Sequence, residues 1–219
     1  MRRGFSLPPK IGLGTLLDGA VHPAWTWDFV RADPIRFANV TGATVDGAHI
    51  DGTTAITLAE YVNAQFDSTL TWDDIDWLRT CWDGPIVVKG IQTVADAKIA
   101  ADEGIEAIAL SNHGGRQLDS APAIADLVAP VADAVGDRIE IICDGGVRRG
   151  SDIVKAVALG ARACMAGRAY LYGLGAAGER GVDHVLNLFD ADLRRTMALI
   201  GAHDVEHLTR DLVSIPKPR

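Results

Sequence analysis

The sequence predicts an α/β fold in which helices cover a parallel β-sheet, and three observations support this prediction. From about residue 70 onward, short apolar runs alternate with helical stretches, which is the pattern of βα units. Each apolar run ends in a polar residue or a glycine, so functional groups should collect at one end of the sheet. The 219 residues are 48% hydrophobic, which suffices for a substantial core.

Four short apolar runs are the predicted strands. They are too short for typical helices, and a strand that is apolar throughout is typical of a parallel sheet buried on both faces. The runs are residues 85–89, 107–111, 140–144 and 163–167.

Helices are predicted between these strands. Residues 93–103 and 151–159 each carry apolar residues on one helical face, and Gly104 and Gly160 follow them as C-terminal stops. Before the first strand, "TWDDIDWLR" predicts a helix that is capped by Thr71 and extends to about Trp82. After the last strand, "VDHVLNLFDADLRRTMALIGA" has helical periodicity and should complete the outer helix layer.

Residues 1–69 differ from the rest of the chain. They contain four prolines, the stretch "GATVDGAHIDGTT" and little sustained periodicity, which indicates a long loop region. No low-complexity tract or charge block marks a linker after it. We therefore expect this region to lie over the functional end of the sheet and not to form a domain of its own.

Composition favours a small-molecule ligand. The net charge is -8 and no basic stripe is present, which argues against a nucleic-acid partner. The three cysteines have no C-x-x-C spacing and indicate neither a disulfide framework nor a zinc site. The opening "MRRGFSLPPK" lacks the apolar stretch expected of a signal peptide, and no apolar run of about 18 residues is found that could span a bilayer. We expect a cytoplasmic protein, with peripheral contact at the inner face of the membrane left open.

The stretch "LSNHGGRQLD", residues 110–119, follows directly after an apolar strand. A lone histidine is more often structural than catalytic, but His113 stands between Asn112 and Gly114 and lies three residues before Arg116. This setting favours a functional histidine. Asp119 could pair with Arg116, or it could cap the next helix, which is the commoner role.

The stretch "DGGVRRGSDIVKAVALGA", residues 144–161, places two glycines between a strand and a helix. Such a turn offers backbone N–H groups and a helix N-terminus to a phosphate group, and an arginine adds charge. "MAGRAY", at the end of the fourth strand, repeats the arrangement in shorter form. Two successive strand ends of this kind resemble the phosphate site after strands seven and eight of a (β/α)8 barrel. Lys89 would then close strand five and point into the same site, because a buried unpaired ammonium is costly.

Together, "VKGI", "LSNHGGRQLD" and "DGGVRRGSDIVKAVALGA" resemble the FMN-dependent 2-hydroxy-acid dehydrogenases and oxidases. Within that family, "RRGFSLPPKIGLGT", "HPAWTWDFVRADPIRFANV" and "AGRAYLYGLGAAGERGV" are most similar to bacterial L-lactate dehydrogenases. The resemblance covers essentially the whole chain. It implies the C-terminal half of a (β/α)8 TIM barrel, namely the last four βα units after a long loop region. It also implies FMN as cofactor and oxidation of a 2-hydroxy acid, L-lactate, to pyruvate.

The resemblance implies a role for each matching residue. His113 would take a proton from the 2-hydroxy acid as electrons pass to flavin N5, and Arg116 would hold the substrate carboxylate. Lys89 would lie beside the flavin edge where negative charge accumulates on reduction, and Ser111 would hydrogen-bond the flavin ring. The residues expected to hold the ribityl phosphate are Asp144, Gly145, Gly146, Val147, Arg148, Gly167 and Arg168.

Other motifs suggest packing. "GLGAAG", residues 173–178, matches a dinucleotide fingerprint but lacks its strand–turn–helix setting, so we interpret it as close helix packing. His203 and His207 are spaced as a helical pair, but "HDVEH" lacks the order of a zinc motif, and no metal site is expected.

The first four strands of the family's barrel have no counterpart here. In the family that this chain resembles, the half that contains those strands also carries substrate-binding tyrosines, a second arginine and the aspartate that orients the histidine. Four parallel strands cannot close a barrel, so we expect a homo-oligomer or a complementing N-terminal half as partner.

The electron acceptor is left open between quinone, cytochrome and oxygen. An inactive half-barrel that at most binds flavin or phosphate, or serves as an assembly module, is the alternative. Another FMN or phosphate-binding barrel, such as an isomerase, would not need the "SNHGGRQ" cluster.

Overall fold

The computed structural model describes residues 12–31, 44–45, 48–49 and 66–214. The chain divides into two compact units, Met1–Thr71 and Trp72–Arg219, and each is described by itself. The elements among the described residues of the first unit are α1 (Leu13–Val21), α2 (Pro23–Arg31) and a short antiparallel pair, β1 (Thr44–Val45) with β2 (Ala48–His49).

The prediction of a loop over residues 1–69 was wrong for α1 and α2. Pro23 is the first residue of α2, a position where a proline costs no hydrogen bond. The prediction failed because proline was taken as a loop marker. The expectation that this region covers the functional end of the sheet stays a prediction, and most of its residues lie outside the described ranges.

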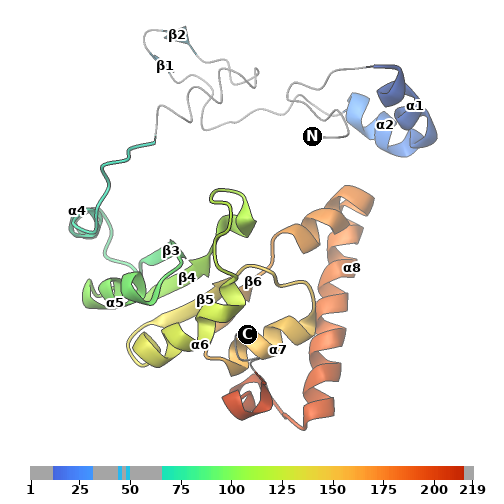
Figure 1. Cartoon of the computed structure of the whole chain (residues 1–219). Coiled ribbons are helices and arrows are strands. Elements are labelled where there is room, and N and C mark those ends of the chain that lie inside the picture. Colours follow the sequence, from blue (N-terminus) through green and yellow to red (C-terminus); the bar gives the residue numbers. More distant parts are fainter. Residues whose placement is uncertain (1–11, 32–43, 46–47, 50–65, 215–219) are drawn as a thin grey trace. The chain divides into compact units, whose positions relative to one another are not determined.

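The second unit is built on a four-stranded parallel sheet in sequence order (Figure 1). Its strands are β3 (Val87–Ile91), β4 (Ala107–Ser111), β5 (Glu140–Asp144) and β6 (Ala163–Met165). The predicted bounds of β4 and β5 are confirmed. β3 is shifted toward the C-terminus and β6 ends two residues earlier than predicted.

The helices predicted over residues 93–103 and 151–159 are confirmed, whereas the sequence analysis did not specify the helix between β4 and β5. The described helices of this unit lie before, between and after the strands. They are α4 (Asp74–Cys81), α5 (Val94–Asp102), α6 (Ile124–Val135), α7 (Gly150–Ala158) and α8 (Arg168–Ile200), with 3-10 turns η1 (His113–Gly115), η2 (Val205–His207) and η3 (Arg210–Leu212). Gly104 and Gly160 end α5 and α7 with positive φ angles, as expected. Thr71 does not cap α4. A turn at Trp72 and Asp73, whose carbonyls accept from Ile75 N and Asp76 N, delays the first helical residue to Asp74.

The two faces of the sheet differ in what covers them. Ile108, Leu110 and Ile141 are fully buried in the core shared with α5, α6 and α7, which lie beside the sheet in Figure 1. On the other face Val87 and Met165 remain 51% and 44% exposed. One face is therefore a packed core, and the other is open.

The long helix α8 is interrupted at Ala177 and Gly178, which have non-helical backbone angles. The interruption lets the backbone of Gly173 contact that of Gly181, where a Cβ on either glycine would overlap the other's carbonyl group. The interpretation of "GLGAAG" as close helix packing is confirmed for Gly173, whereas Gly175 and Gly178 have open space where a Cβ would be.

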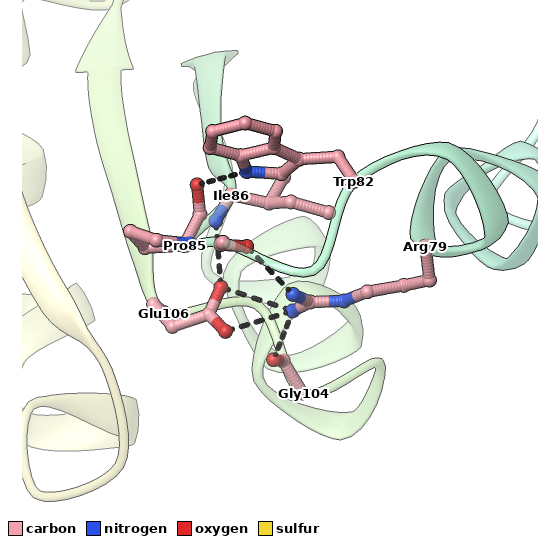
Figure 2. Close-up of polar contacts among 7 residues, drawn as sticks. Arg79, Trp82, Pro85, Ile86, Gly104 and Glu106 are labelled. Atoms are coloured by element: carbon pink, nitrogen blue, oxygen red, sulfur yellow. Dashed lines mark hydrogen bonds and ion pairs between the residues drawn. The ribbon is translucent and has the colours of Figure 1, made fainter.

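A cluster around Arg79 holds α4 to the amino ends of β3 and β4 (Figure 2). The Arg79 guanidinium donates to both Glu106 carboxylate oxygens at 2.9 and 3.0 Å, and to the carbonyls of Gly84 and Gly104. Glu106 also accepts from Ile86 N at 2.7 Å. The bonds from Arg79 and from Ile86 lower the pKa of Glu106 to about 2. This cluster ties together the segments that lead into neighbouring strands.

Candidate active site

The candidate site lies at the carboxyl ends of β3, β4 and β5. The parallel register places Lys89 opposite Ala109 and Ser111 opposite Asp144, so side chains from three strands meet. Lys89 Nζ lies 2.7 Å from Asp144 Oδ2 and donates to Ser111 Oγ at 3.1 Å. Ser111 Oγ in turn donates to Asp144 Oδ2 at 2.6 Å. Sequence reasoning selected all three residues but not this network, because it depends on the register between strands.

Charge balance keeps Asp144 ionised. Burial alone would raise the pKa of the Asp144 carboxyl group. The hydrogen bonds from Lys89 and Ser111, with the charges of Lys89 and His113, outweigh burial and lower it. Ser111 is only 1% exposed, and its hydroxyl is fully used by this network. The Asp144 carboxylate and the Lys89 ammonium therefore form an ion pair at the carboxyl ends of the strands.

The histidine loop follows directly after β4. His113, Gly114 and Gly115 have φ angles of 55, 69 and 70°, a left-handed run that glycine adopts freely and that costs energy for a residue with a side chain such as histidine. His113 N donates to Ser111 Oγ at 3.1 Å, which ties the loop to the network. Backbone strain of this kind is found preferentially at functional sites. The imidazole is exposed, yet near enough to Asp144 to influence its pKa.

Arg116 ends the same short 3-10 turn and its side chain is exposed. The structure therefore places a histidine and an arginine on one loop, beside the ion pair of Lys89 and Asp144. Asp119 accepts from Ser120 N at 3.0 Å. It does not cap α6, because that helix begins five residues later at Ile124, after Ala123.

The glycine loop follows β5. Gly145 and Gly146 have φ angles of 156 and 76°, and Val147 is buried and anchors the loop in the core. Asp152 accepts from the backbone N–H groups of Arg148 and Arg149 at 3.0 and 3.1 Å. Sequence reasoning missed Asp152, although an acidic residue at the third position of a helix is a recognised N-terminal signal.

Two contacts join neighbouring loops. Arg168, in the first turn of α8, donates to the Gly114 carbonyl at 3.3 Å, which links the end of β6 to the histidine loop. The Asn112 side chain donates to the Pro122 carbonyl at 3.0 Å and borders Gly145. Sequence reasoning named Asn112 only as a neighbour of His113.

The predicted phosphate residues stand at two adjacent strand ends. Gly146 and Gly167 have open space where a Cβ would be, so a ligand can approach their backbone. Arg168 is exposed beside them. Arg148 is exposed too and lines a cavity of about 470 Å³ between the loop that precedes α7 and the helix α8, which Lys89 and His113 do not line. Glycine backbone and arginine suit the phosphate of FMN.

The described residues show no group of three or more His, Cys, Asp or Glu side chains arranged to hold a metal ion. His207 Nδ1 is bonded to Asp204 Oδ1 at 2.6 Å, and the His203 ring stands edge-on to it at 6.4 Å. Within the described ranges, no helix is long and apolar enough to cross a membrane.

Comparisons with known proteins agree with this arrangement. The family model for FMN-dependent dehydrogenases matches residues 1–215. A putative L-lactate dehydrogenase of Mycobacterium tuberculosis is 44% identical over 95% of this chain and 48% of its own length. L-lactate dehydrogenase of Caulobacter vibrioides is 41% identical over 96% of this chain and 54% of its own.

Among solved structures, the monotopic membrane protein (S)-mandelate dehydrogenase has a TM-score of 0.82 and 40% identity, covering 95% of this chain and 53% of its own. An L230A mutant of flavocytochrome b2 has a TM-score of 0.64 and 35% identity, over 70% of this chain and 43% of its own. The chain thus spans about half the length of its relatives. The four parallel strands form part of a (β/α)8 barrel. The chain belongs to the family of FMN-dependent dehydrogenases that act on 2-hydroxy acids.

Proposed function

We propose that this chain contributes the base, the substrate anchor and part of the flavin site to an FMN-dependent oxidation of L-lactate to pyruvate. The observation that carries the proposal is the network of Lys89, Ser111 and Asp144, to which the backbone N–H of His113 is hydrogen-bonded through Ser111. L-lactate is favoured as substrate because the full-length relatives named above are L-lactate dehydrogenases.

His113 and Arg116 divide the work on the substrate. Imidazole changes its charge near neutral pH, so His113 can take the proton of the substrate hydroxyl group. Arg116, three residues along the same loop, can hold the substrate carboxylate by charge-assisted hydrogen bonds. FMN, when bound, supplies the acceptor for the two electrons.

The flavin is held by the histidine loop after β4, the glycine loop after β5 and the segment between β6 and α8. Lys89 would stabilise negative charge on the ring, and its ammonium is paired with the Asp144 carboxylate in this structure. Ser111 would hydrogen-bond to the ring by giving up one of the three partners that its hydroxyl has in this structure. The residues assigned to the ribityl phosphate are Asp144, Gly145, Gly146, Val147, Arg148, Gly167 and Arg168.

The proposal includes the protein's surroundings. Quinone, cytochrome or oxygen takes the electrons in turn, and the sheet is completed by a second copy of the chain or by an N-terminal half. A cytoplasmic enzyme attached peripherally to the membrane fits the monotopic (S)-mandelate dehydrogenase among its structural neighbours.

An anaerobic absorption spectrum tests the catalytic proposal. Purified chain with FMN is mixed with L-lactate, D-lactate or (S)-mandelate, and bleaching of the flavin band is followed. L-lactate should bleach it fastest and D-lactate should not bleach it. Faster bleaching by (S)-mandelate would overturn the substrate assignment. Bound flavin that no 2-hydroxy acid bleaches would favour the alternative function, an inactive module that binds flavin.

A further inference from the structure

We propose that Cys143 and Cys164 form a dithiol site that hydrogen peroxide oxidises reversibly to a disulfide between β5 and β6. The disulfide itself follows from the arrangement of the two strands and needs no flavin. Its effect on FMN binding rests on the proposed function, because the loops assigned to the flavin phosphate follow these strands.

The two cysteines are direct neighbours across two parallel strands. In the register of β5 and β6, Cys143 is paired with Cys164. Paired residues of neighbouring strands point to the same face of a sheet. Here that face is the packed one, because Cys143 belongs to the core and Cys164 packs against it. Each thiol therefore has the other beside it.

The spacing of the strands suits a disulfide. Neighbouring strands lie about 4.7–4.9 Å apart, which is within the Cα–Cα range of about 4.4–6.8 Å that disulfides span. The bond also requires Cβ atoms about 3.5–4.5 Å apart, which is less than the strand spacing. Closing the bond therefore draws β5 and β6 toward each other at this pair.

The two thiols differ in reactivity. The hydrogen bond from Cys164 lowers the pKa of the Cys143 thiol, although burial and the charges of Asp144 and Asp152 oppose this effect. The same bond raises the pKa of Cys164. Cys143 is thus the sulfur that reacts as a thiolate. Cys143 is buried and Cys164 is half-buried, so a small oxidant reaches the pair from the side of Cys164.

The two thiols supply both electrons for the reduction of one peroxide. The Cys143 thiolate attacks a peroxide oxygen, the O–O bond breaks, and the released hydroxide takes up a proton to form water. Cys164 then attacks the sulfur of the resulting sulfenic acid, and its proton leaves with the hydroxyl group as a second water. A thiol reductant reverses the reaction. Two-electron reduction of oxygen yields peroxide, so oxygen as the proposed electron acceptor would supply the oxidant.

The disulfide would act on the proposed flavin site through the backbone. Asp144 follows Cys143 directly, and Gly167 lies three residues after Cys164. Asp144 accepts from Ser111 of β4 at 2.6 Å, on the opposite side of β5 from β6. Drawing β5 toward β6 pulls Asp144 away from this partner and displaces both loops assigned to the phosphate. Oxidation should therefore weaken FMN binding.

Peptide mapping and thiol titration test the site. The 219-residue chain is treated with hydrogen peroxide and digested with trypsin without reduction. Trypsin cleaves after Arg148 and Arg162, which lie between the two cysteines, so the disulfide joins two separate peptides. Mass spectrometry should find this linked pair, and titratable thiols of the unfolded chain should fall from three to one. Dithiothreitol should restore all three.

Two variants provide the controls. Cys164→Ala should yield no linked pair, because the resolving thiol is lost. Cys81→Ser, which removes the exposed cysteine of α4, should form the same link as the wild type. In equilibrium dialysis, oxidised wild type should bind FMN at least about fivefold more weakly than reduced wild type, because the phosphate loops are displaced. Cys81→Ser should lose the same affinity, and Cys164→Ala should bind FMN equally before and after peroxide.

The outcomes separate the dithiol from the flavin site. Sulfinic acid or unmodified cysteine in place of the linked peptides, or a link through Cys81 alone, would overturn the dithiol. A linked pair with unchanged FMN affinity would overturn its effect on the flavin site. A reduced chain that binds no FMN would overturn the flavin site and this effect together, whereas the disulfide is detected without flavin.

Discussion

The two faces of the four-stranded sheet use the same strands for different purposes. On one face, Ile108, Leu110 and Ile141 are buried against helices and carry no polar group. On the other, Lys89, Ser111 and Asp144 form a charged network at the strand ends. Because side chains alternate along a strand, Leu110 of β4 is buried in the core, whereas the adjacent Ser111 belongs to the charged network. Substitutions on the two faces should therefore separate folding from function.

The largest effect is expected at the histidine loop. His113→Gln should slow anaerobic flavin reduction about a hundred- to ten-thousand-fold, because the general base is lost. FMN affinity and the urea midpoint should change little, since the imidazole is exposed. Stopped-flow absorbance measures the rate. An unchanged rate would remove His113 from the reaction.

On the packed face, Leu110→Ala should lower the free energy of unfolding by about 2–5 kcal/mol, because it leaves a cavity in the core. Urea denaturation measures this loss. Leu199→Ala, at an exposed position of α8, is the matched control and should cost much less. Equal losses would mean that Leu110 is not the core residue described.

At the network, Lys89→Met removes the partner of Asp144. Lys89 is 44% exposed, so solvent screening should limit the loss of stability to about 1 kcal/mol at pH 7. The folded-state pKa of Asp144 is lowered, so the stabilisation exists above the unfolded pKa and is lost as pH falls through the folded one. The difference between wild type and variant should shrink in acid. Lys98→Met, on an exposed position of α5, should show no such pH dependence.

The smallest effect is expected at the amino end of the sheet. Glu106→Gln weakens the cluster around Arg79. The control is Glu103→Gln, which changes an exposed glutamate nearby. The stabilisation from Glu106 should be complete above its usual pKa of 4.5 and disappear as pH falls through about 2. Urea midpoints measured at pH 7 and toward pH 2 should converge for wild type and Glu106→Gln. A constant gap would contradict the assigned pKa.

The positions of the strands could be predicted from the sequence better than the contacts between them. β4 and β5 were located because short apolar runs end sharply at Ser111 and Asp144. α1 and α2 were missed because four prolines and little sustained periodicity indicated a loop, whereas a proline at a first helical position, such as Pro23, is compatible with the helix.

The candidate site shows the same limit. The glycines and His113 are recognisable as a local motif, but the bonds of Asp144 to Lys89 and Ser111 join residues far apart in the chain. Such bonds follow from strand register, which hydrophobic pattern alone does not specify here, since β4 is buried throughout. Arg168 likewise reaches Gly114 only because β6 lies two strands from β4.

The central claim is that a flavin binds at the carboxyl ends of these strands, with its phosphate held by the glycine-containing loops that follow β5 and β6. Equilibrium dialysis of the 219-residue chain against FMN and against riboflavin, which lacks the phosphate, tests it most directly. The account predicts that FMN binds at least about tenfold more tightly, and that Arg168→Gln removes most of this preference. Equal affinity for the two flavins, or a preference that Arg168→Gln leaves intact, would contradict it.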